Sequence, residues 1–498
     1  MTKHILGISA GFHDAAATVI DADNGNIVFA SQSERFSKRK HDPELSLYLI
    51  NEALSHGTIG TIAYYENHWL KSLRQYLSGE DYKFYFSLRK LLSEHFPFHP
   101  IFLENVKVKS FDHHKSHAAA GFQTSPFDNA TVVVIDAIGE FDTITIWNAS
   151  YNKNGEAKYK LKWKQSYPHS IGLFYSAMTA NVGLKPLDEE YILMGMAAYG
   201  NAQNIKSTIE NNLIESIMPP QFKENLHIGT EKINADKFDI AAATQELYEE
   251  MLCGILEISK KYDMSNNLVL GGGSALNCLA NRLLGAYYEN VWIMPAPGDA
   301  GSSLGAAALE YGKKINWKDA YLGYNIEGEY PVKSALKELL DKQIVGIANG
   351  RAEFGPRSLG NRSLLADPRS PQIKDKVNRI KQRQKFRPFA PVILEEYVND
   401  YFIMPMGFEK SEYMQVVALC KKPNEFPGIV HYDDTSRVQT VPKNNSGIRK
   451  LLEEWHKETG CPMLLNTSLN VRGMPMVNDE LDAKQFEEIY SIKVFTKD

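Results

Sequence analysis

Three side chains with the chemistry of metal ligands stand out in the sequence. His113 and His117 are four residues apart, between a strand-like segment at 107–111 and helix formers at 118–120. On a helix this spacing puts both imidazoles on one face, where they can share a cation. A polar helix N-terminus without a metal is the alternative. Asp299 precedes a helix of small residues and is the third candidate ligand, unless its carboxylate only caps that helix.

A triple glycine is a candidate ligand-binding loop. Gly271, Gly272 and Gly273 follow a strand-like segment at 267–270 and precede apolar residues at helical spacing. Glycines at such a junction let a ligand approach the backbone closely, and the amides of the following helix can face an anion. The loop lacks the lysine of a Walker A motif, so a nucleotide site and a plain tight turn are both compatible with it.

Acidic residues lie in the turns between several strand-like segments. Asp14 follows the first of these segments, and Asp136 and Glu140 follow a later one. Carboxylates in such turns can hold Mg²⁺ or the hydroxyls of a ligand. The alternative is that they only serve the turn itself.

A strongly basic segment lies in the C-terminal third of the chain. Residues 351–387 contain eleven Lys or Arg residues and only three acidic ones, although the whole chain has a net charge of −5. Arg357, Arg362 and Arg387 lie among Gly, Pro and aromatic residues, which fix the backbone and suit bidentate phosphate recognition. A solvated helix face explains the basic residues at 374–385. We expect a small phosphorylated ligand at the arginines in preference to nucleic acid.

Two later segments offer further donors for an anion. Arg437 lies inside a strand-like run, and the loop from Asn466 through Ser468 to Arg472 combines amide, hydroxyl and guanidinium groups after an apolar strand. Both fit the same phosphorylated ligand.

Short apolar segments are expected to position these side chains. Strand-like runs at 5–9, 15–20 and 27–30 surround the first acidic turn, and the pattern recurs at 130–135 and 143–147. Two strand–acidic turn–strand units in one chain indicate an internally duplicated α/β domain. We expect this domain to span residues 1–328. A second α/β domain then spans 329–498.

The length and composition of the chain limit the class of protein to which it can belong. The chain has 498 residues, of which 43% are hydrophobic and 23% charged, which predicts two to four globular domains and excludes a disordered or collagen-like protein. Its negative net charge provides no whole-chain attraction for nucleic acid or membranes. The four cysteines form no C-x-x-C pair, no run of 18 apolar residues occurs, and no signal-peptide pattern is present. These features predict a cytoplasmic protein without membrane contact.

Several segments together resemble the NodU/CmcH-type O-carbamoyltransferases. The resemblance extends from residues 7–14, which read GISAGFHD, to residues 466–473, which read NTSLNVRG. Its most specific part is residues 350–363, GRAEFGPRSLGNRS, which is similar to the family's G-R-x-E-F-G-P-R-A-L-G-N-R-S. Residues 113–119 and 190–197 add independent matches.

The resemblance implies a fold and a reaction. It implies an N-terminal domain of the duplicated actin/sugar-kinase (ASKHA) type and a C-terminal YrdC-like α/β domain. In this family, carbamoyl phosphate and ATP, which can carry Mg²⁺, give carbamoyl-adenylate in the YrdC-like domain. The carbamoyl group then moves to an acceptor hydroxyl at the ASKHA-like site.

The resemblance also implies roles for individual residues. His113, His117 and Asp299 match the family's metal ligands, which hold iron in some members. His13 matches the histidine beside the transferred carbamoyl group, where a near-neutral pKa would suit a general base. Catalytic roles are expected for His13, Asp14, Arg357 and Arg437. Binding of nucleotide and phosphate is expected of Gly271, Gly272, Gly273, Asp136, Glu140, Lys381, Arg387, Asn466, Ser468 and Arg472.

The acceptor and the competing functions stay open at this point. A sugar or natural product with a free hydroxyl is the expected partner, and a hydroxymethylated nucleobase in DNA is the alternative. DNA would need a basic track, for which residues 35–41 and 71–74 are the candidates. A nucleotide-gated binding protein, a sugar kinase and a tRNA threonylcarbamoyl transferase are rival functions. The first two do not need the arginine-rich second domain, and the third divides its half-reactions between separate chains. A homodimer is a further expectation.

Overall fold

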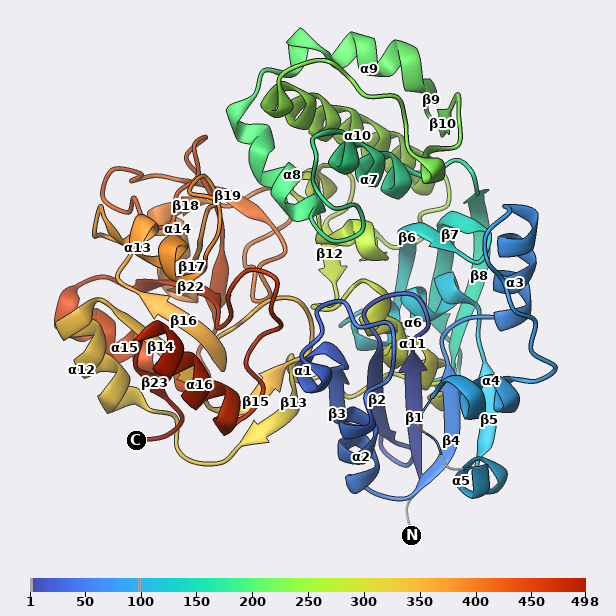
Figure 1. Cartoon of the computed structure of the whole chain (residues 1–498), viewed down its shortest axis with the longest axis horizontal. Coiled ribbons are helices and arrows are strands. Elements are labelled where there is room, and N and C mark those ends of the chain that lie inside the picture. Colours follow the sequence, from blue (N-terminus) through green and yellow to red (C-terminus); the bar gives the residue numbers. More distant parts are fainter. Residues whose placement is uncertain (1–2, 97, 99) are drawn as a thin grey trace.

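Two five-stranded sheets form the framework of the N-terminal part (Figure 1). The computed structural model describes residues 3–96, 98 and 100–498. In spatial order the first sheet contains β3 (Ile27–Gln32), β2 (Ala16–Asp21), β1 (His4–Ser9), β4 (Ile59–Tyr64) and β5 (Lys107–Ser110). The second contains β8 (Ala157–Ser166), β7 (Asp142–Tyr151), β6 (Asn129–Gly139), β11 (Asn267–Gly271) and β12 (Asn290–Ile293).

The two sheets have the same strand order and the same strand directions. In each, a three-stranded antiparallel meander is extended by two strands that run parallel to its first strand. This shared arrangement confirms the internal duplication that the repeated strand–acidic turn–strand units predicted. Strand β1 ends before the turn that carries Asp14, whereas Asp136 lies inside β6, which continues to Gly139, so the turn expected at Asp136 begins only after Gly139.

Two helices rich in small residues lie between these sheets (Figure 1). Helix α6 (His113–Thr124) packs on the second sheet, α11 (Asp299–Tyr311) packs on the first, and the two helices pack against each other. Their approach is so close that a Cβ atom on Gly305 would lie 1.8 Å from the carbonyl oxygen of Ser116. Glycine is therefore required at position 305, because any side chain would push the helices apart. This packing fixes His113 and Asp299, the first residues of the two helices, relative to each other.

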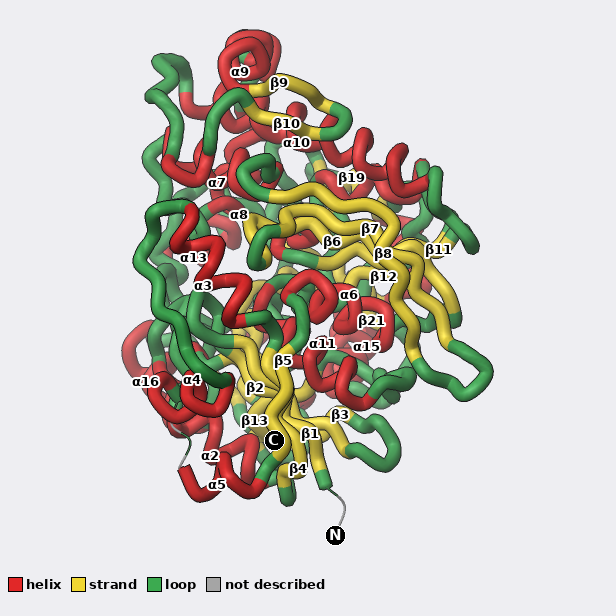
Figure 2. Tube along the Cα trace, turned by 90° about the vertical axis from the view of Figure 1, so that its right-hand side faces the viewer, coloured by secondary structure: helices red, strands yellow, loops and turns green. Residues whose placement is uncertain are grey.

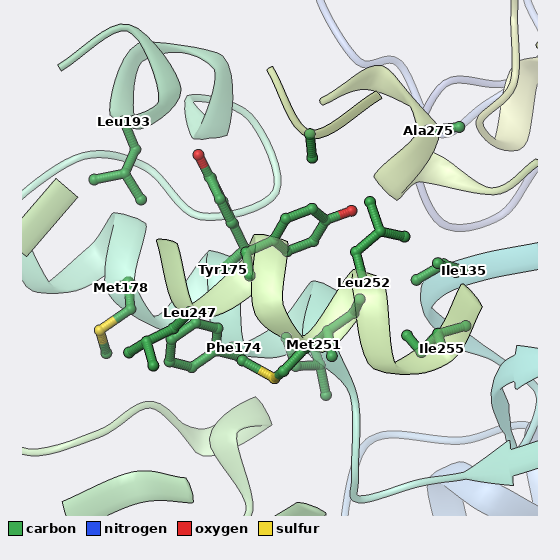
Figure 3. Packing of buried hydrophobic residues seen from close by; sticks show 14 of the residues in the cluster. Ile135, Phe174, Tyr175, Met178, Leu193, Leu247, Met251, Leu252, Ile255 and Ala275 are labelled. Atoms are coloured by element: carbon green, nitrogen blue, oxygen red, sulfur yellow. The ribbon is translucent and has the colours of Figure 1, made fainter. Parts of the chain in front are cut away.

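The remaining N-terminal helices lie outside the pair of sheets (Figure 1). A large apolar core joins the second sheet to the helices above it, and Figure 3 shows its centre, where Phe174 and Met178 pack against Leu247 and Met251. The helices of the first sheet are α1 (Glu34–Ser37), α2 (Leu47–Ser55), α3 (His68–Leu77), α4 (Leu88–His95) and α5 (Pro100–Asn105). Those of the second are α7 (Ile171–Asn181), α8 (Glu190–Met196), α9 (Lys206–Leu213) and α10 (Lys237–Lys260), with the hairpin β9 (Ile214–Ile217) and β10 (Pro220–Phe222).

The C-terminal part is a second α/β unit built on a six-stranded mixed sheet. Its strands are β21 (Gln439–Val441), β17 (Ala390–Leu394), β22 (Met463–Ser468), β16 (Arg362–Ala366), β14 (Ile344–Ala348) and β23 (Val494–Phe495). Separate apolar cores fill its two faces. Helices α12 (Val332–Lys342) and α15 (Gly447–Thr459) cover one, and α13 (Ile373–Ile380), α14 (Val398–Tyr401) and α16 (Glu480–Tyr490) cover the other. A small sheet of β18 (Phe402–Ile403), β19 (Val417–Cys420) and β20 (Thr435–Arg437) lies beside it.

A two-stranded sheet joins the two parts. Strand β13 (Tyr321–Ile326) precedes the boundary expected near residue 328, and β15 (Gly350–Glu353) follows it, yet the two strands pair. Arg351 of β15 also donates to the carbonyl oxygen of Val28 in β3 at 2.7 Å. The connection is therefore hydrogen-bonded to both parts.

Figure 2 shows the face of the molecule on which α3 and α4 lie, with the long strands β7 and β8 next to each other in the upper part of the view. Among the residues that the structure describes, we find no helix with the length and apolarity needed to cross a bilayer.

Candidate active site

Four side chains converge between the two N-terminal sheets. His113 Nε2 and His117 Nε2 lie 3.1 Å apart, and each lies 3.0 Å from Asp136 Oδ2. Asp299 Oδ1 lies 3.4 Å from His113 Nε2 and 3.3 Å from His117 Nε2. The two histidines share a face of α6 as the spacing predicted, and α11 and β6 supply the carboxylates.

This cluster has the donor set of a transition-metal site. Two imidazole nitrogens and two carboxylate oxygens point at a common centre, which suits a divalent cation such as Fe, Mn or Zn. Ser302 Oγ lies 3.1 Å from His117 Nδ1 and orients that ring, as second-sphere partners of metal-bound histidines do. The sequence predicts nucleotide or Mg²⁺ binding for Asp136, whereas in the structure its carboxylate lies 3.0 Å from both histidines and joins this cluster. The signal in the sequence is that each of the two repeated units carries an aspartate, Asp14 or Asp136, after its first apolar run.

The carboxylates are held in the charged form by the histidines. Burial alone would lower the pKa of His113, but Asp299 and Asp136 raise it well above its usual value. The pKa of His117 is raised in the same way, and those of Asp136 and Asp299 are lowered by the two imidazoles despite their burial. A metal cation would replace these protons, because both compete for the same lone pairs.

Asp299 does not act as the helix cap that the sequence allowed. Gly298 is the N-cap residue of α11, and Asp299 is the first helical residue. Its side chain, which is 4% exposed, turns toward the histidine pair. Asp299 is thus free to serve as a ligand.

His13 lies beside this cluster and is held by two acidic residues. Its Nε2 lies 3.8 Å from Asp299 Oδ2, and its Nδ1 lies 3.0 Å from Asp14 Oδ2. Burial favours the neutral ring, but Asp299 and Asp14 raise the pKa of His13 to about 9. The expected near-neutral pKa is therefore wrong for the protein without a metal. A cation at the cluster would offset the charge of Asp299 and lower this pKa.

The triple glycine packs against the cluster instead of beginning an α-helix. Gly272 has φ = +86°, and a Cβ atom there would lie 2.2 Å from the carbonyl oxygen of Ile135. Its neighbour Gly273 donates its N–H to Asp136 Oδ1 at 3.4 Å. The chain then continues as two 3₁₀ segments, η4 (Gly273–Leu276) and η5 (Ala280–Ala286), so the expected α-helix amides are not there to face an anion.

Glu140 supports the start of α6, the helix that carries the two histidines. It has φ = +55°, and its carboxylate accepts hydrogen bonds from the backbone N–H groups of Asn67 and His113. Burial raises the pKa of Glu140 to about 7. Its carboxylate therefore contacts the starts of α3 and α6, whereas the sequence suggested a contact with cofactor.

A cavity of about 480 Å³ runs from this cluster to the basic residues of the C-terminal part. His13, Asp136 and Asp299 line one end, together with Gly273. The other end is lined by Arg357, Lys381, Arg383, Arg387, Arg437 and Arg472. The residues expected to perform two different steps thus face a common space.

The basic end of the cavity carries uncompensated positive charge. Among the described residues, only Arg472 of these six has a carboxylate within ion-pair distance, namely Glu189 at 2.7 Å. Burial and the neighbouring Arg437 lower the pKa of Arg357 to about 9, and burial with Arg383 lowers that of Lys381. Like charges held together in this way are costly unless an anion binds among them.

Residues at the end of β22 and in the loop that follows it hold Lys381 in place at the basic end of the cavity. Lys381 donates to Ser468 Oγ at 3.0 Å and to Asn470 Oδ1 at 2.7 Å. Asn466 is held by Ser358 and Gln439, so its amide nitrogen is already committed to the protein.

Two arginines have roles that differ from the sequence interpretation. Arg362, grouped above with the phosphate-binding arginines, is fully buried, and its guanidinium donates to backbone carbonyls that include Asn349, Tyr324 and Asn478. It is a structural residue. Arg383, assigned to a solvated helix face, instead stacks 4.1 Å from the centroid of the Phe389 ring and lines the cavity. The sequence contains one signal for this role, because Arg383 lies close to the aromatic residues Phe386 and Phe389.

The two candidate basic tracks for DNA are largely paired within the protein. Lys40 binds Asp188 at 2.8 Å, and Lys38 binds Asp482. In the second track, Lys71 binds Glu66 at 2.7 Å. Such pairs leave little positive charge for a polyanion.

Comparison with known proteins shows the family to which this site belongs. A family model described as Carbamoyltransferase N-terminus matches residues 48–308, and one described as Carbamoyltransferase C-terminus matches residues 336–496. The chain belongs to the carbamoyltransferase family. It is therefore a transferase, as the resemblance to NodU/CmcH-type enzymes implied.

Relatives of this carbamoyltransferase span most of its length. The Synechocystis sp. protein sll1178, described as uncharacterized, is 33% identical over 96% of this chain and 93% of the relative. Nodulation protein NolO of Bradyrhizobium diazoefficiens is 31% identical over 75% of each chain. Among solved structures, HypF from T. kodakarensis aligns with a TM-score of 0.33 and 12% identity over 62% of this chain and 48% of that one.

Proposed function

We propose that this carbamoyltransferase forms carbamoyl-adenylate among the C-terminal arginines, where carbamoyl phosphate loses phosphate to water and the resulting carbamate displaces pyrophosphate from ATP. The carbamoyl group then moves to a hydroxyl beside His13, and AMP leaves. The observation that carries the proposal is the cavity that joins the unpaired basic residues to the cluster of histidines and aspartates. We further propose that residues 1–328 form an ASKHA-like transfer domain and residues 329–498 a YrdC-like adenylate-forming domain.

The first step needs positive charge around phosphoryl groups. Carbamate is a poor electrophile, and a mixed anhydride with AMP gives it a good leaving group. Arg357, Arg387 and Arg437 lack carboxylate partners among the described residues, so their guanidinium groups are available to the phosphates. Fixed donors of this kind stabilise negative charge where it develops in the transition state.

The second step needs a metal ligand set and a group that accepts a proton. His113, His117, Asp136 and Asp299 would hold a divalent ion, for which iron is our proposal, and the ion would polarise bound oxygen atoms as a Lewis acid. His13, fixed by Asp14, would accept the proton of the acceptor hydroxyl at Nε2. This role requires the neutral imidazole, which a cation beside Asp299 favours.

The acceptor that we propose is a small molecule with a free hydroxyl. Lys38, Lys40 and Lys71 are paired with carboxylates and so leave little free positive charge near His13 to bind DNA. A hydroxymethylated nucleobase in DNA is thereby the less favoured acceptor. Membership in the carbamoyltransferase family also argues against the nucleotide-gated binding protein and the sugar kinase.

Release of AMP from ATP tests the proposal directly. The full-length protein should release AMP only when carbamoyl phosphate is present, and a panel of sugars, nucleosides and hydroxymethylated DNA should identify the acceptor by its carbamoylated product. An Arg357→Ala variant serves as the matched negative control. AMP release that is independent of carbamoyl phosphate would refute the adenylate step.

A further inference from the structure

Residues 188–191 contact both ends of the cavity. Asp188 Oδ1 accepts a hydrogen bond from Lys40 Nζ at 2.8 Å and lies 2.8 Å from His41 Nε2, and His41 in turn contacts Asp14 beside His13. The next residue, Glu189, accepts a hydrogen bond from Arg472 Nη2 at 2.7 Å. The ring of Tyr191 lies 4.7 Å from the Arg387 guanidinium. Contacts that belong to opposite ends of the site are thus made by neighbouring residues at the start of α8.

On the metal side, these contacts hold the turn that presents His13. His41 Nδ1 lies 2.8 Å from Asp14 Oδ1, and the other oxygen of Asp14 lies 3.0 Å from His13 Nδ1. Asp14 and His41 have φ values of 50° and 53°, which are disfavoured for residues other than glycine. Such conformations persist only where surrounding contacts impose them. Asp188 supplies one of these contacts through His41.

On the arginine side, Glu189 accepts a hydrogen bond from one donor of the Arg472 guanidinium, its Nη2. Arg472 is the one of the six basic residues at this end of the cavity that has a carboxylate partner among the described residues. The Glu189 carboxylate is 16% exposed and the Arg472 side chain 43% exposed, so the pair can exchange with solvent anions. A phosphate that takes the Nη2 donor of Arg472 therefore competes with Glu189 for it.

We propose that residues 188–191 couple the two ends of the cavity. An anion at Arg472 releases Glu189, and the resulting shift of this segment alters the contact of Asp188 with His41 and so the position of Asp14 and His13. Filling the arginine pocket thereby adjusts the transfer site. The inference rests on the proposed phosphate pocket. Because coupling between two binding sites is reciprocal, changes at Asp188 also affect the response to the anion.

Binding of pyrophosphate tests the competition at Arg472. Isothermal titration calorimetry on the full-length protein should show that Glu189→Gln binds pyrophosphate about 2- to 5-fold more tightly, the range expected when an exposed ion pair no longer competes. The control is Glu224→Gln, which removes the same charge from an exposed residue outside the cavity lining and should leave the affinity unchanged. An affinity of Glu189→Gln equal to that of the wild type would overturn the proposal.

Hydrogen exchange tests the transmission. In the wild type, pyrophosphate should change amide exchange in peptides covering residues 11–14 and 38–42, and this response should be lost in Asp188→Asn and in Glu189→Gln. Asp188→Asn should still bind pyrophosphate, because the arginine pocket and the Glu189–Arg472 pair remain, but with an altered affinity because the coupling is reciprocal. A full response in Asp188→Asn would refute the coupling and leave the pocket intact. If pyrophosphate failed to bind the wild type, the proposed phosphate pocket would fall, and this inference with it.

Discussion

The two ring nitrogens of His117 face different partners. Nε2 points at Asp136 and Asp299, while Nδ1 lies against Ser302 Oγ, the arrangement of a metal-binding imidazole with its supporting hydrogen bond. The sequence identified the histidines because their spacing is local. It could not show that Asp136 joins them, because only the folded sheets bring β6 and α6 together.

Loss of a metal ligand should reduce the metal content of the protein more than loss of the hydroxyl that supports it. We expect His117→Ala to lose the bound divalent ion, and Ser302→Ala to retain it with about 10- to 100-fold lower affinity, the usual effect of removing a supporting partner. Elemental analysis after dialysis against buffered metal would measure both. Full metal content in His117→Ala would disprove the assignment of the cluster.

His41 should contribute stability that depends on pH. Burial favours its neutral form, but Asp14 and Asp188 raise its pKa from 6.5 to about 10 in the folded protein. A raised pKa means that the folded state binds the proton more tightly, so the stabilisation is complete below pH 6.5 and disappears as pH rises through 10. We expect His41→Gln to lower the free energy of unfolding by about 2 kcal/mol at pH 6.

The comparison of Tm between wild type and His41→Gln at pH 6, 8 and 10 would check this trend. The difference should shrink as pH rises. A difference that is constant across this range would show that the imidazolium charge is not what stabilises the turn.

At the scale of elements, two arginines near the loop between β15 and β16 have different roles. Arg357 lies in the loop and lines the cavity, whereas Arg362 begins β16 and stabilises the fold. Glu353 accepts hydrogen bonds from the backbone N–H groups of Asn361 and Arg362, and so shapes the loop that presents Arg357 to the cavity. Arg357 has no carboxylate partner among the described residues, whereas Arg362 fills its donors with carbonyl groups. In sequence the two arginines looked equivalent, because burial and partners are properties of the fold.

Alanine variants of the two arginines should therefore behave oppositely. Arg357→Ala should reduce carbamoyl-phosphate-dependent AMP release roughly 10- to 150-fold, the effect of losing a charge-assisted contact, with an unchanged Tm. Arg362→Ala should lower the free energy of unfolding by about 3 kcal/mol or more, because it leaves several buried carbonyls without donors. Equal Tm values for both variants would contradict this division.

The strands were easier to predict than the segment after the triple glycine. Strands β1, β2, β6 and β7 fall where β-branched runs predicted them, because apolar runs between turn residues specify strands locally. Residues 275–282 have helical spacing of apolar residues but are not α-helical. Asn277 Oδ1 accepts the N–H of Ala280 and Asn281 binds the carbonyl of Gln415, so polar side chains interrupt the helix through local and distant contacts.

For the whole molecule, the pairing of surface charges predicts that the rate of carbamoyl transfer depends only weakly on salt concentration. With Lys38, Lys40 and Lys71 bound to carboxylates, the approach to His13 offers few contacts for a polyanion. We expect carbamoyl transfer to a small hydroxyl compound to change little between 50 and 200 mM salt, whereas a DNA acceptor would lose several orders of magnitude in affinity over roughly this range. A steep decline in rate with salt, together with carbamoylation of hydroxymethylated DNA, would reverse our choice of acceptor.

The shared cavity has a consequence for reaction kinetics. A single molecule confined to about 480 Å³ has an effective concentration of roughly 3 M, far above the level that a released intermediate reaches in solution. The proposed anhydride would therefore meet the acceptor hydroxyl as a reactant at molar concentration, without a second diffusional encounter. Its partition between productive transfer and loss to hydrolysis would then depend on how long the cavity retains it, and not on the amount of enzyme present.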